Sequence, residues 1–324
     1  MIRSLLACVL LAPLLPPAAD GPVGPRGAPL EQDPQRVITW RGCGISKKAF
    51  MAHAAEVYEQ RTGVRVELSG GGAALGIQAA GEGAADFGGT CRRCLTDGPE
   101  GELELVLTQV AWDALAVVVH PSNPVDGLTR DQLVRVLRGE VTNWSELGGE
   151  DRPLLVVARK GKSSGVGYMV RVQMLGDPDF DFGKRTLRLE SSGPVEKLVE
   201  KSAGAIAITG VSSARLRELK LLELDGGAPT AEDIATGTYP YYRPLYLAHA
   251  PELDPEQARF RSWILGEEGQ AAVAEEGTVT LAQGVALTGT FAHYGDTSLV
   301  TNHAELMEAW EAWRREHEAK GVER

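Results

Sequence analysis

Short apolar runs alternate with small-residue turns and amphipathic segments along most of the chain. Runs such as 37–40 and 115–119 are β-prone and apolar, as in buried strands, whereas 47–61 and 130–137 read as helices. This order of strand, glycine turn and helix repeats from the start, which predicts an α/β fold with a largely parallel sheet. The other expected strands are 64–68, 85–88, 154–158 and 205–208, and the other expected helices are 73–78, one beginning at Ser164, one or two within 255–276, and 304–320.

The N-terminus has the layout of an export signal. Arg3 supplies a positive charge, an apolar stretch covers 5–15, and small residues follow it. The stretch is shorter than the roughly 20 residues that a membrane span needs. We therefore expect residues 1–19 to be a signal peptide and 20–36, rich in Gly and Pro, to be a flexible leader. The expected location is periplasmic or otherwise exported.

Composition narrows the functional classes. The 324 residues carry a net charge of −11, from 44 acidic and 33 basic residues, which argues against nucleic acid as a partner. It does not exclude a small anionic ligand. Hydrogen-bond donors inside a cleft act on the ligand directly, whereas salt screens the repulsion from distant acidic side chains. The six histidines are scattered, and no nucleophile elbow or paired-carboxylate motif occurs. We expect a binding protein and not an enzyme, without a cofactor or bound metal, and monomeric.

Four small-residue turns, at 42–46, 69–76, 88–91 and 161–165, lead or could lead from a strand into a helix. Such turns present backbone N–H groups at the positive end of a helix, where an anion can bind. Each one alone is compatible with ordinary turn chemistry. In open α/β sheets, however, they gather at the carboxyl ends of the strands, so four together predict a binding cleft.

Several strings in this order resemble the periplasmic phosphate-binding proteins of ABC transporters. They are 69–72 (Ser-Gly-Gly-Gly), 85–89 (Ala-Asp-Phe-Gly-Gly), 143–149 (Asn-Trp-Ser-Glu-Leu-Gly-Gly), and Arg159 followed by Ser164-Gly165. The resemblance extends from residue 37 to about residue 284. It implies a type II periplasmic-binding-protein fold, in which two α/β lobes joined by hinge crossover strands close on the ligand.

The resemblance also implies a division of the chain and a partner. The crossovers would lie near 111–119 and 239–247. Residues 37–113 and 243–290 would form lobe 1, residues 114–242 would form lobe 2, and 291–324 would add a charged C-terminal helix. The implied function is capture of a phosphate-like oxyanion for an ABC permease, with a membrane sensor as the alternative partner.

Matching the motifs places the family's ligand residues on this sequence. Arg159 takes the position of the arginine that pairs with phosphate oxygens, and Ser164 and Gly165 take those of the hydroxyl and amide donors. Ser46, which could also cap the first helix, matches the donor of the first loop. The second-loop serine falls at Ala73 or Ala74, so that hydroxyl is missing. The expected ligand-binding residues are Ser46, Gly72, Ala73, Cys91, Arg159, Ser164 and Gly165.

The cysteines are the main departure from the family pattern. The family's anion-facing aspartate falls at Cys91, Cys43 lies in the first loop, and Cys94 follows Cys91 by one helical turn. Three interpretations stay open: a Cys91–Cys94 or Cys43–Cys91 disulfide, a three-thiolate site for arsenite, Cu(I) or zinc, and free or redox-active thiols. The alternative functions are therefore a soft-ligand receptor feeding a sensor or transporter, and a thiol redox protein using Cys91 and Cys94.

Overall fold

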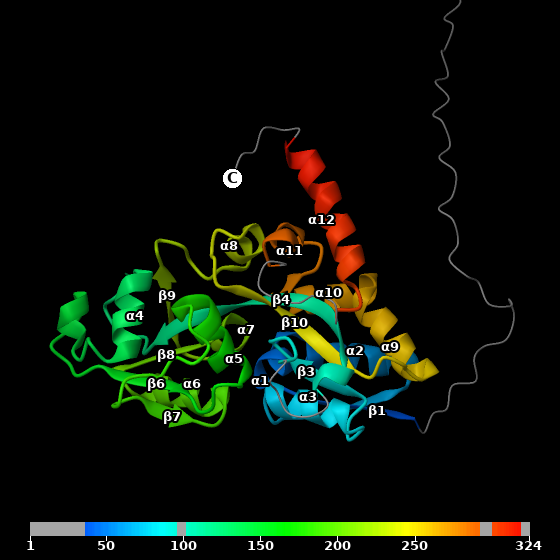
Figure 1. Cartoon of the computed structure of the whole chain (residues 1–324), viewed down its shortest axis with the longest axis horizontal. Helices are drawn as coiled ribbons and strands as arrows, with labels where there is room; N and C mark the ends of the chain where they lie inside the picture. The colour runs from blue at the N-terminus through cyan, green and yellow to red at the C-terminus, as the bar shows by residue number, and fades with distance from the viewer. Residues whose placement is uncertain (1–35, 96–101, 292–299, 319–324) are drawn as a thin grey trace, which may run out of the picture. The chain divides into compact units, whose positions relative to one another are not determined.

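The computed structural model describes residues 36–95, 102–291 and 300–318 (Figure 1). The chain separates into two units, 1–34 and 35–324, and all described residues belong to the second. The expected signal peptide and nearly all of the expected leader lie outside the described residues. Among the described helices, none combines the length and the apolar character that crossing a membrane requires.

The sheet follows one continuous path through eight strands. In spatial order they are β2 (Arg65–Ser69), β1 (Val37–Gly42), β3 (Phe87–Thr90), β10 (Tyr242–His249), β4 (Val106–Val119), β8 (Ala205–Gly210), β6 (Leu155–Arg159) and β7 (Leu187–Leu189). Off this path, β11 (Val279–Thr280) and β9 (Lys220–Leu224) pair with β4, and β5 (Gly127–Leu128) pairs with β9.

The two central strands run against their neighbours. β1 pairs in parallel with β2 and β3, and β6 pairs in parallel with β7 and β8. β10 and β4 pair with each other, and with the strands beside them, in antiparallel fashion. The sheet is therefore mixed, and the prediction of a largely parallel sheet holds for each half but is wrong for the centre.

β4 belongs to both halves of the sheet. Its first part, from Val106 to Ala114, pairs with β10, and its last part, from Leu115 to Val119, pairs with β8. β4 and β10 thus connect the two halves, and both are buried along almost their whole length. β4 begins at Val106, five residues before the expected crossover at 111. The expectation began too late because the polar residues Thr108 and Gln109 interrupt the apolar run, although both are buried in the strand.

In the half that contains β1, β2 and β3, the helices pack closely on the sheet. α3 (Ala73–Gly81) contacts β1 and β3, and its approach depends on glycine: a Cβ at Gly88 would overlap the backbone of Gly76. The first helical segment is α1 (Gly44–Ser46), a π turn η1 (Lys47–Met51) and α2 (Ala52–Thr62) in succession. α9 (Pro255–Leu265) and α10 (Glu267–Glu275) pack beside α2 (Figure 1).

In the half that contains β6, β7 and β8, the helices are α4 (Arg130–Arg138), α5 (Gly165–Met169) continued by the π turn η4 (Val170–Leu175), α6 (Ser192–Lys201) and α7 (Val211–Ala214). The motif that begins with Asn143 and Trp144 stabilises the local fold of this half. Asn143 caps the 3-10 helix η3 (Trp144–Leu147), and the Glu146 carboxylate accepts the Asn143 N–H in return. Trp144 is buried and donates through Nε1 to the Gly204 carbonyl, 2.9 Å away.

The last helices are α8 (Ala231–Thr236), α11 (Val285–Phe291) and α12 (His303–Glu318). α12 confirms the helix expected at 304–320 to within two residues. It packs on α11, where a Cβ at Gly289 would overlap the Trp310 ring, and it extends away from the sheet in Figure 1.

Candidate functional site

The four small-residue turns meet at one place, between the two halves of the sheet. A Cβ added at Gly165 would overlap the Cys91 Sγ and would lie 3.0 Å from the Cβ of Ala73. A Cβ at Gly72 would lie 3.9 Å from Nη2 of Arg159. The turns after β1, β2 and β3 therefore face the turn after β6, as the sequence predicted. Their role in binding a ligand stays a prediction.

Cys43 begins the first helix at this place. Its Sγ accepts the Ser46 N–H at 3.3 Å as the N-cap of α1, and the Ser46 Oγ lies 3.0 Å from the same sulfur. Ser46 was expected to cap the helix itself, which is wrong: it lies inside α1, fully buried, with its hydroxyl on Cys43. The helix starts earlier than expected because a thiol, an unusual cap, performs the role that Ser or Asp commonly has.

Cys91 lies between the two lobes and is held by an arginine from the centre of the sheet. Nη1 of Arg243, on β10, donates to the Cys91 Sγ at 3.2 Å, and Nη2 donates to the Oδ2 of Asp113, on β4, at 3.1 Å. The other oxygen of Asp113, Oδ1, accepts from the backbone N–H of Ser212 at 3.0 Å and from its hydroxyl at 2.7 Å. Both carboxylate oxygens of Asp113 are thus engaged.

The two buried thiols share a hydrogen bond, and this separates their acidities. The hydrogen bond from Cys91, together with those from Ser46 and the charge of Arg243, lowers the pKa of Cys43 to about 6 against the opposing effect of burial. The same hydrogen bond and burial raise the pKa of Cys91 well above its ordinary value. The pair therefore loses one proton easily and keeps the other, so that it carries one negative charge around neutral pH.

Arg159 ends β6 at the edge of this cluster. Its Nε is buried and has no hydrogen-bond partner within the described ranges. Burial lowers the pKa of its guanidinium, although the nearby thiols act in the opposite direction. The group stays charged, because an arginine in a protein does not lose its proton. A cation with an unsatisfied, buried donor is ready to bind an anion.

Ser164 and Gly165 lie at the start of α5, next to Arg159. Ser164 is the N-cap residue, but its hydroxyl donates to the Gly161 carbonyl at 3.3 Å and does not cap the helix. The first N–H groups of a helix have no acceptor within the helix itself. The start of α5 thus adds donors beside the guanidinium.

Three side chains link the two halves around this cluster. Lys48, in η1, donates to the Ser213 Oγ at 2.9 Å, and the Nε of Arg92 donates to the Ser163 carbonyl at 2.9 Å. Arg215 donates to the Oγ1 of Thr278 at 3.1 Å. The two halves of the molecule are therefore in direct contact around this cluster.

Cys94 does not belong to the cluster of Cys43 and Cys91. It packs against a second apolar group that includes Ile77, Leu105 and Tyr246, and burial raises its pKa to about 11. None of the three described cysteines forms a disulfide, so neither expected disulfide is present. Within the described part of the chain, no three His, Cys, Asp or Glu side chains form a group that could hold a metal ion, so the three-thiolate site is not found there.

The residues that sequence analysis missed are Arg243 and Asp113. Asp113 is the only Asp, Glu, Lys or Arg of β4, and Arg243 is the only one of β10, and both strands are almost completely buried. This is a detectable signal, because ionisable side chains are almost never fully buried unless they are paired. The partner of each, however, lies on the other strand and cannot be identified from local sequence.

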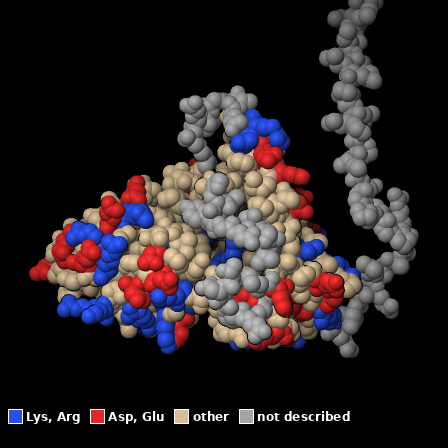
Figure 2. Space-filling model, in the orientation of Figure 1, with Lys and Arg blue, Asp and Glu red and all other residues tan. Residues whose placement is uncertain are grey.

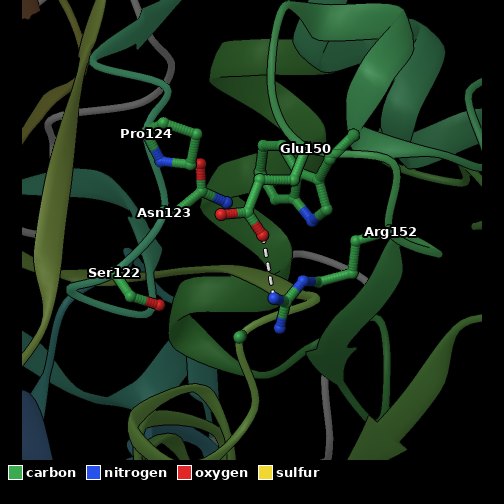
Figure 3. Close-up of a pocket in the computed structure, with 7 residues that line it drawn as sticks. Ser122, Asn123, Pro124, Glu150 and Arg152 are labelled. Carbon is green, nitrogen blue, oxygen red and sulfur yellow. Dashed lines mark hydrogen bonds and ion pairs between the residues drawn. The ribbon is translucent and has the colours of Figure 1, made fainter.

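The second half also has hollows of its own, and the largest of those described lies between Arg138, Leu154 and Arg185. The small pocket in Figure 3 is lined by Ser122, Asn123, Pro124, Trp144, Glu150, Arg152 and Ala203. In it, Arg152 and Glu150 point toward each other and form an ion pair at 2.8 Å. Arg152 precedes β6 whereas Arg159 ends it, so this pocket lies at the opposite end of the strand. Another, mostly apolar pocket adjoins Arg159 itself.

On the face shown in Figure 2, the second half has no large region of one charge sign. Figure 2 shows Lys and Arg intermixed with Asp and Glu over this half of the molecule. Attraction of a small anion therefore depends on the local donors around Arg159 and not on the net charge of −11.

Comparisons with known proteins agree with this fold. A family model described as the PBP superfamily domain matches residues 34–268. The phosphate-binding protein PstS of Bacillus subtilis is 25% identical over 241 residues, which is 74% of this chain and 78% of that protein. PstS of Pseudomonas aeruginosa is 29% identical over 198 residues, or 55% of this chain and 60% of that protein.

Solved structures extend the likeness to the whole two-lobed fold. A structure described as a phosphate ABC transporter substrate-binding protein from Clostridium perfringens, with bound phosphate, has a TM-score of 0.66 and 27% identity, over 76% of this chain and 99% of that one. An ABC-type phosphate transport receptor from Vibrio cholerae has a TM-score of 0.59 and 30% identity, over 76% of this chain and 100% of that one. The predicted type II fold and the predicted resemblance are confirmed. This chain belongs to the PBP superfamily, in the family of the phosphate-binding receptors of ABC transporters.

Proposed function

We propose that this protein is the solute-binding protein of an ABC importer and captures a phosphate-like oxyanion between its two lobes. The relatives named above as phosphate-binding proteins support the class of ligand. Members of this family bind and deliver a solute, so no catalytic step is part of the proposal. The thiol redox function is not favoured, because Cys94 packs outside the cluster and its pKa is raised.

The observation that carries the proposal is one buried donor atom, the Nε of Arg159. This atom lacks a partner within the described residues, and Ser164 and Gly165 follow Arg159 at the start of α5. Gly72 and Ala73, at the start of α3, and Cys91 face these residues from the other lobe. An oxyanion bound here would contact both lobes, and such a ligand stabilises the closed form by its differential affinity.

The proposal includes a place and a partner. The expected signal peptide at 1–19 supports an exported, periplasmic protein that meets its permease at the outer face of the membrane. A closed form that differs in shape from the open form offers the permease a means of recognising the loaded protein. Co-purification with the permease in the presence, but not in the absence, of phosphate tests this part.

Titration calorimetry with phosphate tests the site. Arg159→Ala is expected to weaken phosphate binding by about 2–5 kcal/mol, since it removes one partner of a buried charge pair. Arg159→Lys is expected to recover only part of this loss, because an ammonium lacks the bidentate fork. Arg152→Ala, at the other end of β6, is the matched control and should bind like the wild type. Unchanged affinity in Arg159→Ala would remove Arg159 from the site.

A further inference from the structure

The cluster around Arg159 contains many hydrogen-bond donors and few acceptors. The donors are its guanidinium and the first N–H groups of α3 and α5, whereas the Ser164 hydroxyl donates to the Gly161 carbonyl. The carboxylate that acts on Cys91 is Asp113, and both of its oxygens are already engaged by Arg243 and Ser212. The carboxylates that act on Arg159 are also paired: Glu190 with Lys160, and Glu196 with Lys48 and Arg217. A bound anion therefore finds no free carboxylate there.

The side chain that faces Gly165 across the lobes is the thiol of Cys91. A thiol is a weak hydrogen-bond acceptor and a weak donor. A thiolate would be a better acceptor, but a dianion bound beside it disfavours a second negative charge and raises the pKa of the thiol pair. A bound dianion therefore favours the neutral forms of Cys43 and Cys91, which can donate to the ligand but accept little from it.

The side chain at position 91 then decides whether the site distinguishes a protonated oxyanion from an unprotonated one. A carboxylate at this position would accept a hydrogen bond from a protonated oxyanion, such as hydrogen phosphate, and would repel an oxyanion without a proton. A neutral thiol offers neither the attraction nor the repulsion. Discrimination against a competing ligand commonly depends on such a repulsive element.

From this geometry we infer that Cys91, held by Arg243, is the specificity-determining residue and that the cleft accepts unprotonated tetrahedral dianions such as sulfate alongside phosphate. The inference rests on the oxyanion-binding function proposed above and names the class of ligand more closely. It concerns selection among oxyanions and requires no metal ion.

Competitive calorimetry on the reduced full-length mature protein, at about pH 7, tests the inference with sulfate and phosphate. The wild type is expected to bind sulfate within about tenfold of phosphate. Cys91→Asp is expected to weaken sulfate binding by at least about 100-fold relative to phosphate, because a like charge then faces the ligand. Cys91→Ser keeps a neutral side chain and should retain the wild-type ratio of the two affinities.

The outcomes separate the inference from the function on which it rests. A wild type that binds phosphate but rejects sulfate by more than about 100-fold overturns the inference and leaves the proposed function intact. A wild type that binds neither anion overturns both. An unchanged ratio in a folded Cys91→Asp variant removes the role from Cys91, and Cys94→Ser controls for the loss of a thiol elsewhere. Should Cys91→Asp fail to fold, the wild type and Cys91→Ser still decide the result.

Discussion

Arg243 and Asp113 face each other directly across the paired strands β10 and β4, with Nη2 and Oδ2 3.1 Å apart and side chains 0% and 1% exposed. These are the strands that join the two halves of the sheet. The same guanidinium holds the Cys91 thiol. One buried ion pair thus connects the two central strands with the thiol of Cys91.

Removing one partner of this pair should destabilise the protein strongly. Asp113→Asn leaves Arg243 charged and uncompensated, and we expect the free energy of unfolding to fall by about 3–5 kcal/mol in urea denaturation. The double variant Asp113→Asn, Arg243→Met should recover part of this loss, because no unpaired charge remains. Glu67→Gln, in an exposed pair with Arg65, is the control and should change stability little. Additive losses in the double variant would contradict the pairing.

A second prediction concerns closure of the lobes. Lys48 is 32% exposed and reaches the Oε2 of Glu196, which is completely buried, at 3.4 Å and the hydroxyl of Ser213 at 2.9 Å. Lys48→Met removes these contacts between the two halves of the molecule, so the open form should gain population. Phosphate affinity should fall by about 3–10-fold, as for a loss of roughly 1 kcal/mol.

Small-angle scattering of the unliganded protein provides the independent measurement. The Lys48→Met variant should have the larger radius of gyration, and saturating phosphate should restore the value of the wild type. Lys47→Met is the matched control, since Lys47 precedes Lys48 in η1 and forms no ion pair with the described residues. Equal scattering of the two variants would show that Lys48 does not bias closure.

Much of the fold could be predicted because its signals are local. The apolar runs at 37–40 and 205–208 lie in β1 and β8, and the helix expected to begin at Ser164 is α5, with Ser164 as its N-cap residue. The direction of the central strands could not be predicted, because β4 and β10 are far apart in the sequence and their pairing is a tertiary property. The buried polar residues of β4 also shortened the expected crossover.

The candidate site was predictable to the extent that it consists of turns. Arg159 ends β6, Cys91 directly follows β3, and Gly165 lies in the turn after β6, so the carboxyl ends of the strands bring them together. The contribution of Arg243 was not predictable, since its distance to Cys91 depends on how β3 and β10 pair. The role of Cys43 as a helix cap was missed because thiols are uncommon at that position.

The acidity of Cys43 predicts how anion affinity depends on pH. Its pKa of about 6 reflects the hydrogen bonds from Cys91 and Ser46 and the charge of Arg243, which itself pairs with Asp113. Above that pH the free protein carries a thiolate near Arg159, whereas a bound dianion favours the protonated pair. Binding therefore takes up a proton, and the affinity is highest below about pH 6 and falls as the pH rises, by up to about tenfold per unit.

Sulfate is the suitable probe for this dependence, because it does not itself gain or lose a proton near neutral pH. Calorimetry in two buffers with different ionisation enthalpies measures the proton uptake directly. In Cys43→Ser the affinity should be nearly independent of pH, since the acidic thiol is gone. A Cys43→Ser variant with the same slope as the wild type would assign the titration to another group.

The last prediction tests the contact between the lobes at Gly165. A Cβ at this position would overlap the Cys91 Sγ and approach the Cβ of Ala73 to 3.0 Å, so Gly165→Ala should prevent the lobes from closing fully. Overpacking of this kind costs about 1–3 kcal/mol, which corresponds to a loss of roughly 5- to 150-fold in phosphate affinity. The free energy of unfolding should change less, because the open form can accommodate the methyl group.

A compensating substitution makes this contact specific. Cys91→Ala removes the sulfur, so the added methyl group then meets only Ala73. The double variant Gly165→Ala, Cys91→Ala should therefore bind phosphate more tightly than Gly165→Ala alone, whereas additive losses would place the obstruction elsewhere. Gly161→Ala is not a suitable control, because Gly161 has a φ of 82° and alanine would be strained there for a different reason. Gly44, where an added Cβ meets no atom within 4 Å, is the matched position, and Gly44→Ala should bind like the wild type.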